Sequence, residues 1–253
     1  MLPVQISPAQ SSSNSSQSSL INVCITPEVS GGGDLVKSLQ NSLIFHSFVG
    51  VSSIRLYSRA VSQSVMQTTQ SLLSSSNTSV QILTWNLPHD VDSAVTSQII
   101  SHDCYYSSRH IFQFYSVLNS FQVFMPTQTG KLGDALLSLE HSLQKGPNKV
   151  GVKKYCSEYP TEKKAKGLSI PIPMLESSWY NKQLSENEEI SLVKLSDDKE
   201  PVKDDKVLTE ELSLNEYRAC DKYDFSETDE NSVYQNFALK FSTDLISYYR
   251  KLL

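Results

Sequence analysis

Short β-branched runs alternate along the first half of the chain with segments in which apolar residues recur every three or four positions. The runs predict four strands, at Ile21–Thr26, Ile54–Tyr57, Val80–Trp85 and Phe114–Leu118. The segments with helical spacing are Leu35–Leu43, Val61–Leu73, Ser93–Tyr105, Leu132–Leu143 and Val233–Tyr249. Strands that alternate with helices predict an α/β fold, with a Rossmann-type, mainly parallel sheet flanked by helices.

The polar stretches divide the chain into one domain and two peripheral segments. Residues 1–19 are rich in Ser, Gln and Asn, and we expect them to be disordered because they bury too little apolar surface. Residues 20–253 then form a single domain, which the C-terminal helix closes. Within it, residues 183–211 are dense in Glu, Asp and Lys, which predicts a mobile surface insertion.

Charge and hydropathy exclude some partners. The 253 residues carry a net charge of −5, which gives no electrostatic reason to bind nucleic acid or an anionic membrane. The sequence contains no run of about 20 apolar residues, so we expect no membrane span.

The four cysteines, Cys24, Cys104, Cys156 and Cys220, are isolated from one another. They could form two disulfides by three different pairings, or they could be four buried thiols. Their spacing lacks the Cys-x-x-Cys pairs of a structural zinc site.

The segment His102–Pro126 carries the strongest functional signal. It reads His-Asp-Cys-Tyr-Tyr, an aromatic strand, Asn119-Ser120-Phe121-Gln122, and then Val-Phe-Met-Pro. This resembles glycosyltransferase family 92, whose members read roughly Asn-Asp-Cys-x-Tyr-Arg, an apolar strand, and Asp-x-Asp-Glu-Phe-x-x-Pro. Aligning the final prolines puts Asn119 and Phe121 at the two Asp positions and Gln122 at the Glu position.

Weaker points of resemblance flank that segment. The predicted second strand ends at Tyr57, as the corresponding family strand does, and Trp85–Pro88 is similar to a family Trp and Pro after the third strand. Asn215–Arg218 is similar to a family His-Tyr-Arg element, with Glu216 in place of a metal-binding His. The resemblance therefore covers roughly residues 21–156 and, more faintly, the C-terminal region.

The resemblance implies a GT-A fold and transfer of a galactose-like hexose, with inversion, from a UDP-sugar to a glycan. It also implies Golgi or membrane association, since family members are typically Golgi enzymes. The donor-binding residues it implies are Tyr57, Arg109, Asn119, Gln122 and Arg218. Family members hold Mn²⁺ on the Asp-x-Asp carboxylates, whereas here the metal positions are Asn119 and Glu216.

The substitutions bear directly on the chemistry. The Asn119 amide is neutral and Phe121 offers no ligand, so a metal site would lose two negative charges. A metal-independent transferase would instead need cations beside the diphosphate, and Arg109, Arg218 and Lys131 are the candidates. Asp103 is the candidate catalytic base, although a structural role in hydrogen bonding fits its position equally well.

Two hypotheses remain open. One is a divergent transferase, and the other is a catalytically inactive GT-A protein that binds a nucleotide or a protein partner. The literal Asp90-Val91-Asp92 precedes a predicted helix, so we interpret Asp92 as an N-cap. No Ser-His-Asp order and no Gly-x-Ser-x-Gly motif supports a hydrolase.

Overall fold

The computed structural model describes residues 4–6, 20–26, 35–58, 63–74, 76–84, 92–121, 123–139, 146–157, 168, 172, 175, 179–181, 189–195, 205–206, 214–219 and 233–253. The strands are β1 (Val4–Ile6), β2 (Ile21–Ile25), β3 (Ser53–Ser58), β4 (Ser79–Thr84), β5 (Phe114–Leu118), β6 (Val123–Phe124), β7 (Gly146–Ser157), β8 (Trp179–Asn181), β9 (Glu189–Lys194), β10 (Asp205–Lys206) and β11 (Leu214–Ala219). The helices are α1 (Leu35–Phe48), α2 (Gln63–Leu73), α3 (Ser93–Ser108), α4 (Leu132–Ser138) and α7 (Val233–Leu252).

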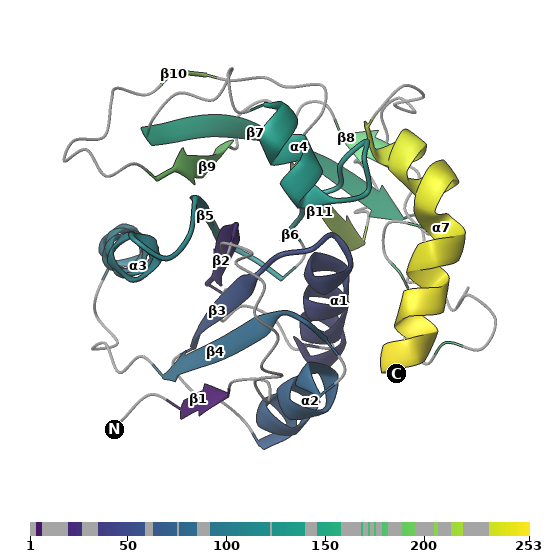
Figure 1. Cartoon of the computed structure of the whole chain (residues 1–253), viewed down its shortest axis with the longest axis horizontal. Coiled ribbons are helices and arrows are strands. Elements are labelled where there is room, and N and C mark those ends of the chain that lie inside the picture. The colour runs from purple at the N-terminus through teal and green to yellow at the C-terminus, as the bar shows by residue number, and fades with distance from the viewer. Residues whose placement is uncertain are drawn as a thin grey trace.

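One mixed sheet runs through the molecule in the order β1-β4-β3-β2-β5-β9-β7-β11-β6 (Figure 1). The block β4-β3-β2-β5 is parallel throughout. Beyond it, β9 pairs antiparallel with both β5 and β7, and β11 returns to a parallel pairing with β7. The expected α/β class is thus confirmed, but the mainly parallel sheet is limited to the N-terminal block.

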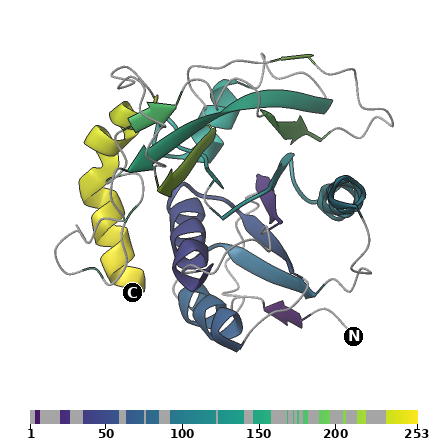
Figure 2. The same cartoon turned by 180° about the vertical axis from the view of Figure 1, so that it is seen from behind.

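The central strand β2 is buried on both faces because helices cover both of them. All five of its residues are buried, which is typical of a parallel strand inside an α/β sheet. Helices α1 and α2 lie on one face, and α7 packs against α1 from outside; α3 lies alone on the other face (Figures 1 and 2).

The face under α1 contains the larger hydrophobic core. Phe45 of α1 packs edge-on against Phe124 and Phe237, with ring centroids 5.2 and 5.7 Å away. The turn before α4 also packs here, and it needs glycine at position 130. Gly130 has a φ of +74°, and a Cβ there would approach the Phe241 ring to 2.6 Å.

Three strands lie in segments that their composition predicts to be unstructured: the two-residue β10, which pairs with β7, and the strands β9 and β1, which contain apolar residues. Within 183–211, Glu189–Lys194 forms β9, whose Ile190, Leu192 and Val193 are buried. Within 1–19, Val4–Ile6 forms β1, antiparallel to β4. In β1 and β9, a few apolar residues within a polar segment form a strand that pairs with a neighbouring strand. The mean composition of the whole segment does not reveal this short apolar pattern.

The remaining boundaries agree closely with the expected elements. The strand Phe114–Leu118 is confirmed as β5, while α4 ends at Ser138, before the expected Leu143. No helix within the described ranges combines the length and the apolar character that crossing a membrane requires.

Candidate functional site

The parallel block has a switch in connectivity between β2 and β5. Strand β2 leads to α1 on one face, whereas β5 is reached from α3 on the other face (Figure 1). In open α/β sheets, ligands bind beyond the carboxyl ends of the strands at such a point. Here the carboxyl ends of the two strands are joined by the Thr26 N–H, which donates to the Leu118 carbonyl at 2.8 Å. Asn119 follows directly and is exposed.

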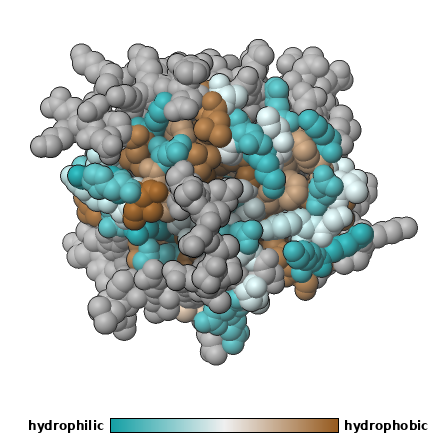
Figure 3. Space-filling model, in the orientation of Figure 1, coloured by the Kyte–Doolittle hydropathy of each residue, from teal (hydrophilic) through white to brown (hydrophobic). Residues whose placement is uncertain are grey.

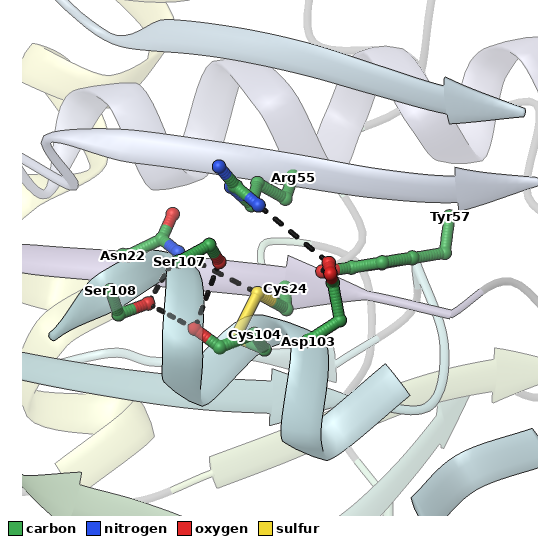
Figure 4. A network of polar contacts seen from close by, with 8 residues as sticks. All are labelled: Asn22, Cys24, Arg55, Tyr57, Asp103, Cys104, Ser107 and Ser108. Carbon is green, nitrogen blue, oxygen red and sulfur yellow. Dashed lines mark hydrogen bonds and ion pairs between the residues drawn. A yellow bond between two sulfur atoms is a disulfide. The ribbon is translucent and has the colours of Figure 1, made fainter. Parts of the chain in front are cut away.

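A polar cluster lies between β3 and α3 on the α3 face (Figure 4). The Tyr57 hydroxyl donates to Asp103 Oδ2 at 2.6 Å. The Arg55 guanidinium lies 3.7 Å from the same oxygen. Arg55 and Tyr57 alternate with Ile54 and Leu56 along β3, so the strand period places both on the face that α3 covers.

The three residues of this cluster differ in how much of each side chain is exposed to solvent. Tyr57 is only 3% exposed, whereas the side chains of Arg55 and Asp103 are 20% and 45% exposed. Burial raises the pKa of the Tyr57 hydroxyl, and the bond to Asp103 raises this pKa further. Tyr57 is therefore a fixed donor that orients Asp103, while Arg55 and Asp103 can reach a ligand.

A disulfide fixes α3 beside this cluster. Cys24 in β2 is bonded to Cys104, the residue after Asp103, and both are fully buried. Of the cysteine arrangements left open by the sequence, the structure contains this pairing; Cys220 and the side chain of Cys156 lie outside the described residues. The bond connects the central strand directly to the helix turn that carries Asp103 (Figure 4).

Polar contacts of the last turn of α3 show in which direction the helix crosses the sheet. Asn22, at the start of β2, donates from Nδ2 to Ser108 Oγ at 2.8 Å, and Ser108 Oγ donates to the Cys104 carbonyl at 2.5 Å. The C-terminal end of α3 thus lies at the amino edge of the sheet, and its N-terminal half points toward the carboxyl edge. Asp92 begins this helix, with its carboxylate accepting from the Ala94 N–H at 2.7 Å, which confirms the predicted N-cap.

Arg109 is not part of the cluster. It follows the last turn of α3 at the amino edge, where its guanidinium lies 5.8 Å from the centre of the Tyr106 ring. Its Nε donates to His110 Nε2 at 2.9 Å. The structure therefore places Arg109 at the C-terminal end of α3, away from the contact between Asp103 and Tyr57.

The positions aligned with the family's metal ligands have different surroundings. Phe121 is 7% exposed and belongs to the large hydrophobic core. Glu216 lies on β11, where it pairs with Val123 of β6, close in sequence to Phe121. Among the described residues, no group of three or more His, Cys, Asp or Glu side chains is placed to hold a metal ion. Gln122 and the side chain of Arg218 lie outside the described residues.

Lys131, the third candidate cation, has a structural partner. Its Nζ donates to the Phe48 carbonyl at 2.7 Å and lies 5.2 Å from the centre of the Phe48 ring. A cation at this carbonyl stabilises the C-terminal end of α1. Lys131 therefore lies on the α1 side of the sheet, away from Asp103.

Some members of the cluster could not be identified from the sequence. Arg55 was not a candidate residue, and the only signal for it is the alternation Ile-Arg-Leu-Tyr, which places Arg55 and Tyr57 on one side of a strand. The contact with Asp103 depends on how α3 crosses β3, which the sequence pattern does not specify.

The structure also has an apolar hollow on the opposite face of the sheet. It is a small depression, partly open to solvent, between α1, α2, β4 and the end of α7. Its lining is largely aliphatic, including Leu43, Ile44 and Leu72, with Ser47 and Thr78 at its polar points. None of the described residues that line this hollow is charged, so it does not suit a diphosphate. Comparison of the sequence with protein-family models and with curated proteins finds no match.

Proposed function

We propose that this chain is a GT-A-type protein related to glycosyltransferase family 92 that binds a UDP-sugar at the carboxyl edge of β3, β2 and β5. The observation that carries the proposal is the strand order β4-β3-β2-β5, with its switch in connectivity beside Asn119. The resemblance around His102–Pro126 supports the same site, because it aligns the turn after β5 with the donor-binding turn of that family. The activity this implies is transfer of a galactose-like hexose to a glycan, with inversion.

The exposed groups of the cluster suit a nucleoside diphosphate. The Asp103 carboxylate can accept hydrogen bonds from ribose hydroxyls, the role that acidic residues have in other nucleotide-binding α/β folds. Arg55 supplies a guanidinium beside it, and guanidinium groups bind phosphate oxygens in a bidentate manner. Tyr57 acts through Asp103 by fixing the orientation of the carboxylate.

The residues present do not fit the manganese site of the family. Asn119 supplies a neutral oxygen, and Phe121 is packed in the core, where a carboxylate would be buried without a partner. We therefore derive no catalytic step that depends on a metal. In a transfer without metal, Arg55 is the described cation best placed to balance the charge of the leaving diphosphate.

The burial of Phe121 favours a second candidate, a protein that binds the nucleotide without turnover. Such a protein keeps the site formed by β3, β2, β5 and α3 and lacks the carboxylates that assist transfer. Both candidates share nucleotide binding and differ only in the fate of the sugar.

Release of UDP from UDP-galactose distinguishes the two candidates. The purified chain is incubated with UDP-galactose and a β-linked galactoside or N-acetylglucosaminide acceptor, and free UDP is measured over time with and without Mn²⁺. An active transferase releases UDP faster with acceptor present, and Arg55→Gln lowers the rate at least tenfold while Arg109→Gln leaves it unchanged. No release above an enzyme-free control, together with measurable UDP binding, supports the non-catalytic candidate.

A further inference from the structure

The outward side of α3 carries a stripe of exposed residues that the candidate site does not use. At positions 92, 95, 99, 102, 106 and 109 the spacing alternates between three and four residues, as in the contact seam of paired helices. These positions hold Asp92, Val95, Ile99, His102, Tyr106 and Arg109, and every one is exposed. The apolar members are well exposed, with Val95 at 46%, Ile99 at 37% and Tyr106 at 60%.

This stripe is unusual for a helix surface in contact with water. An exposed helix face normally carries charged residues, but between Asp92 and Arg109 the only charged residue is Asp103, which is engaged with Tyr57 and Arg55. In Figure 1, α3 lies at the edge of the molecule and no labelled element covers its outer side; Figure 2 shows the same helix at the edge from behind. Figure 3 shows brown side chains among teal ones on that side. The helix thus presents apolar surface both to the sheet and away from it.

The stripe is complementary to itself when two helices run in opposite directions. Antiparallel pairing about a twofold axis between Ile99 and His102 sets each stripe position against one of the second copy. The opposed pairs are Asp92 with Arg109, Val95 with Tyr106, and Ile99 with His102, each occurring twice because of the symmetry. The charges are therefore opposite at both ends of the seam, and its middle is apolar or aromatic.

We propose that the chain forms a homodimer through antiparallel packing of α3 against α3 of a second copy. The charge complementarity between Asp92 and Arg109 selects a second copy as the occupant, because the same helix supplies both halves of each ion pair. Parallel packing would instead set Asp92 against Asp92 and Arg109 against Arg109, which is repulsive. The dimer proposal does not rest on nucleotide binding, and Asp103 lies one helical turn from both Ile99 and Tyr106, beside the seam.

The size of the seam sets the expected affinity. A standard protein interface involves about 20–30 residues on each side, and the α3 stripe contributes fewer. We therefore expect a dissociation constant on the order of micromolar.

Sedimentation velocity across a dilution series tests the dimer. The chain should sediment as a dimer at high concentration and dissociate on dilution. Ile99→Glu should weaken association at least tenfold, because it buries two carboxylates near the twofold axis. The matched control is Gln98→Glu, which adds the same charge to an exposed position off the stripe and should leave the dimer intact.

Charge reversal tests the antiparallel register itself. Arg109→Glu sets acid against acid at both ends of the seam, and Asp92→Lys sets base against base, so each variant alone should be monomeric. Mixed in equal amounts they should form a heterodimer, because each end then joins opposite charges. Asp92→Lys also removes the N-cap, so circular dichroism must show that α3 is retained; if it is not, Ile99→Glu carries the test.

A wild-type chain that remains monomeric at the highest attainable concentration would overturn the proposal. So would an Ile99→Glu variant as dimeric as the wild type. Monomeric single variants that fail to associate on mixing would exclude the antiparallel register.

Discussion

The two faces of the parallel block are stabilised in different ways. On the α1 face, aromatic and aliphatic side chains from α1, β6 and α7 fill a large core. On the α3 face, few apolar residues of the helix are buried, notably Ile100 and Cys104. The disulfide to Cys24 and the contacts of Asp103 and Ser108 supplement that smaller area. Because a disulfide and polar contacts attach α3 to the sheet, the helix can carry half-exposed polar groups at the edge of a site. A fully apolar interface would have no place for such groups.

The α1 face should be the more sensitive to truncation of a side chain. Phe45 is fully buried and touches the rings of His46, Phe124 and Phe237. Phe45→Ala should lower the free energy of unfolding by about 3–5 kcal/mol, through lost burial and the cavity left behind. Gln98→Ala, at an exposed position of α3 off the stripe, should change it by less than about 0.5 kcal/mol. Urea denaturation measures both, and equal losses would remove the contrast between the faces.

The α3 face should depend most on its covalent bond. Cys24 and Cys104 are separated by 80 residues in sequence, so the disulfide removes much conformational entropy from the unfolded chain. Replacing both by Ala should cost about 4 kcal/mol. The matched control is Ile100→Ala, which truncates a buried side chain of α3 and leaves the disulfide intact. An unfolding free energy unchanged in the double variant would contradict the role assigned to this bond.

The buried side chain of His46 should make the α1 face sensitive to acid. Burial lowers the pKa of His46 to about 4, partly offset by its hydrogen bond to the Ser42 carbonyl. The unfolded chain therefore takes up a proton near the ordinary value of 6.5, before the folded chain does. The stability contributed by neutral His46 is complete above about pH 6.5 and is lost as the pH falls toward 4, amounting to about 3 kcal/mol.

Denaturation between pH 4 and pH 7 measures this loss. His46→Asn should flatten the pH dependence, since Asn can still donate near the Ser42 carbonyl and does not titrate. A profile for His46→Asn as steep as that of the wild type would show that other groups dominate.

The smallest effect should come from the polar cluster of the α3 face. A double-mutant cycle with Tyr57→Phe and Asp103→Asn should give a coupling energy of about 1 kcal/mol, because one hydrogen bond to a half-exposed carboxylate is removed. Tyr57→Phe combined with His102→Asn should be additive. A coupling energy near zero in the first cycle would mean that Tyr57 does not orient Asp103.

The elements with strong local patterns were predictable from the sequence, and those that depend on distant pairing were not. β2, β3, β4 and β5 were found because each is an apolar run between polar turns, and Asp92 was found because it precedes a helix. β9 was missed because its apolar residues lie between acidic and basic ones, and its place in the sheet is determined by contacts with β5 and β7. The mixed character of the sheet follows from these antiparallel pairings.

The candidate site was predictable only in part. Tyr57, Asp103 and Asn119 came from the resemblance, and the structure brings Tyr57 and Asp103 into contact. Arg109 came from the same resemblance, yet the direction of α3 places it at the opposite edge of the sheet. Arg55 was missed because its role requires the packing of α3 on β3.

Calorimetric titration of UDP tests the central claim that the carboxyl edge of the parallel block binds a nucleoside diphosphate. UDP is titrated into the wild-type chain with and without Mn²⁺, and into Arg55→Gln and Arg109→Gln. We expect binding to the wild type, at least tenfold weaker binding to Arg55→Gln, and unchanged binding to Arg109→Gln. No binding to the folded wild-type chain in either condition would contradict it.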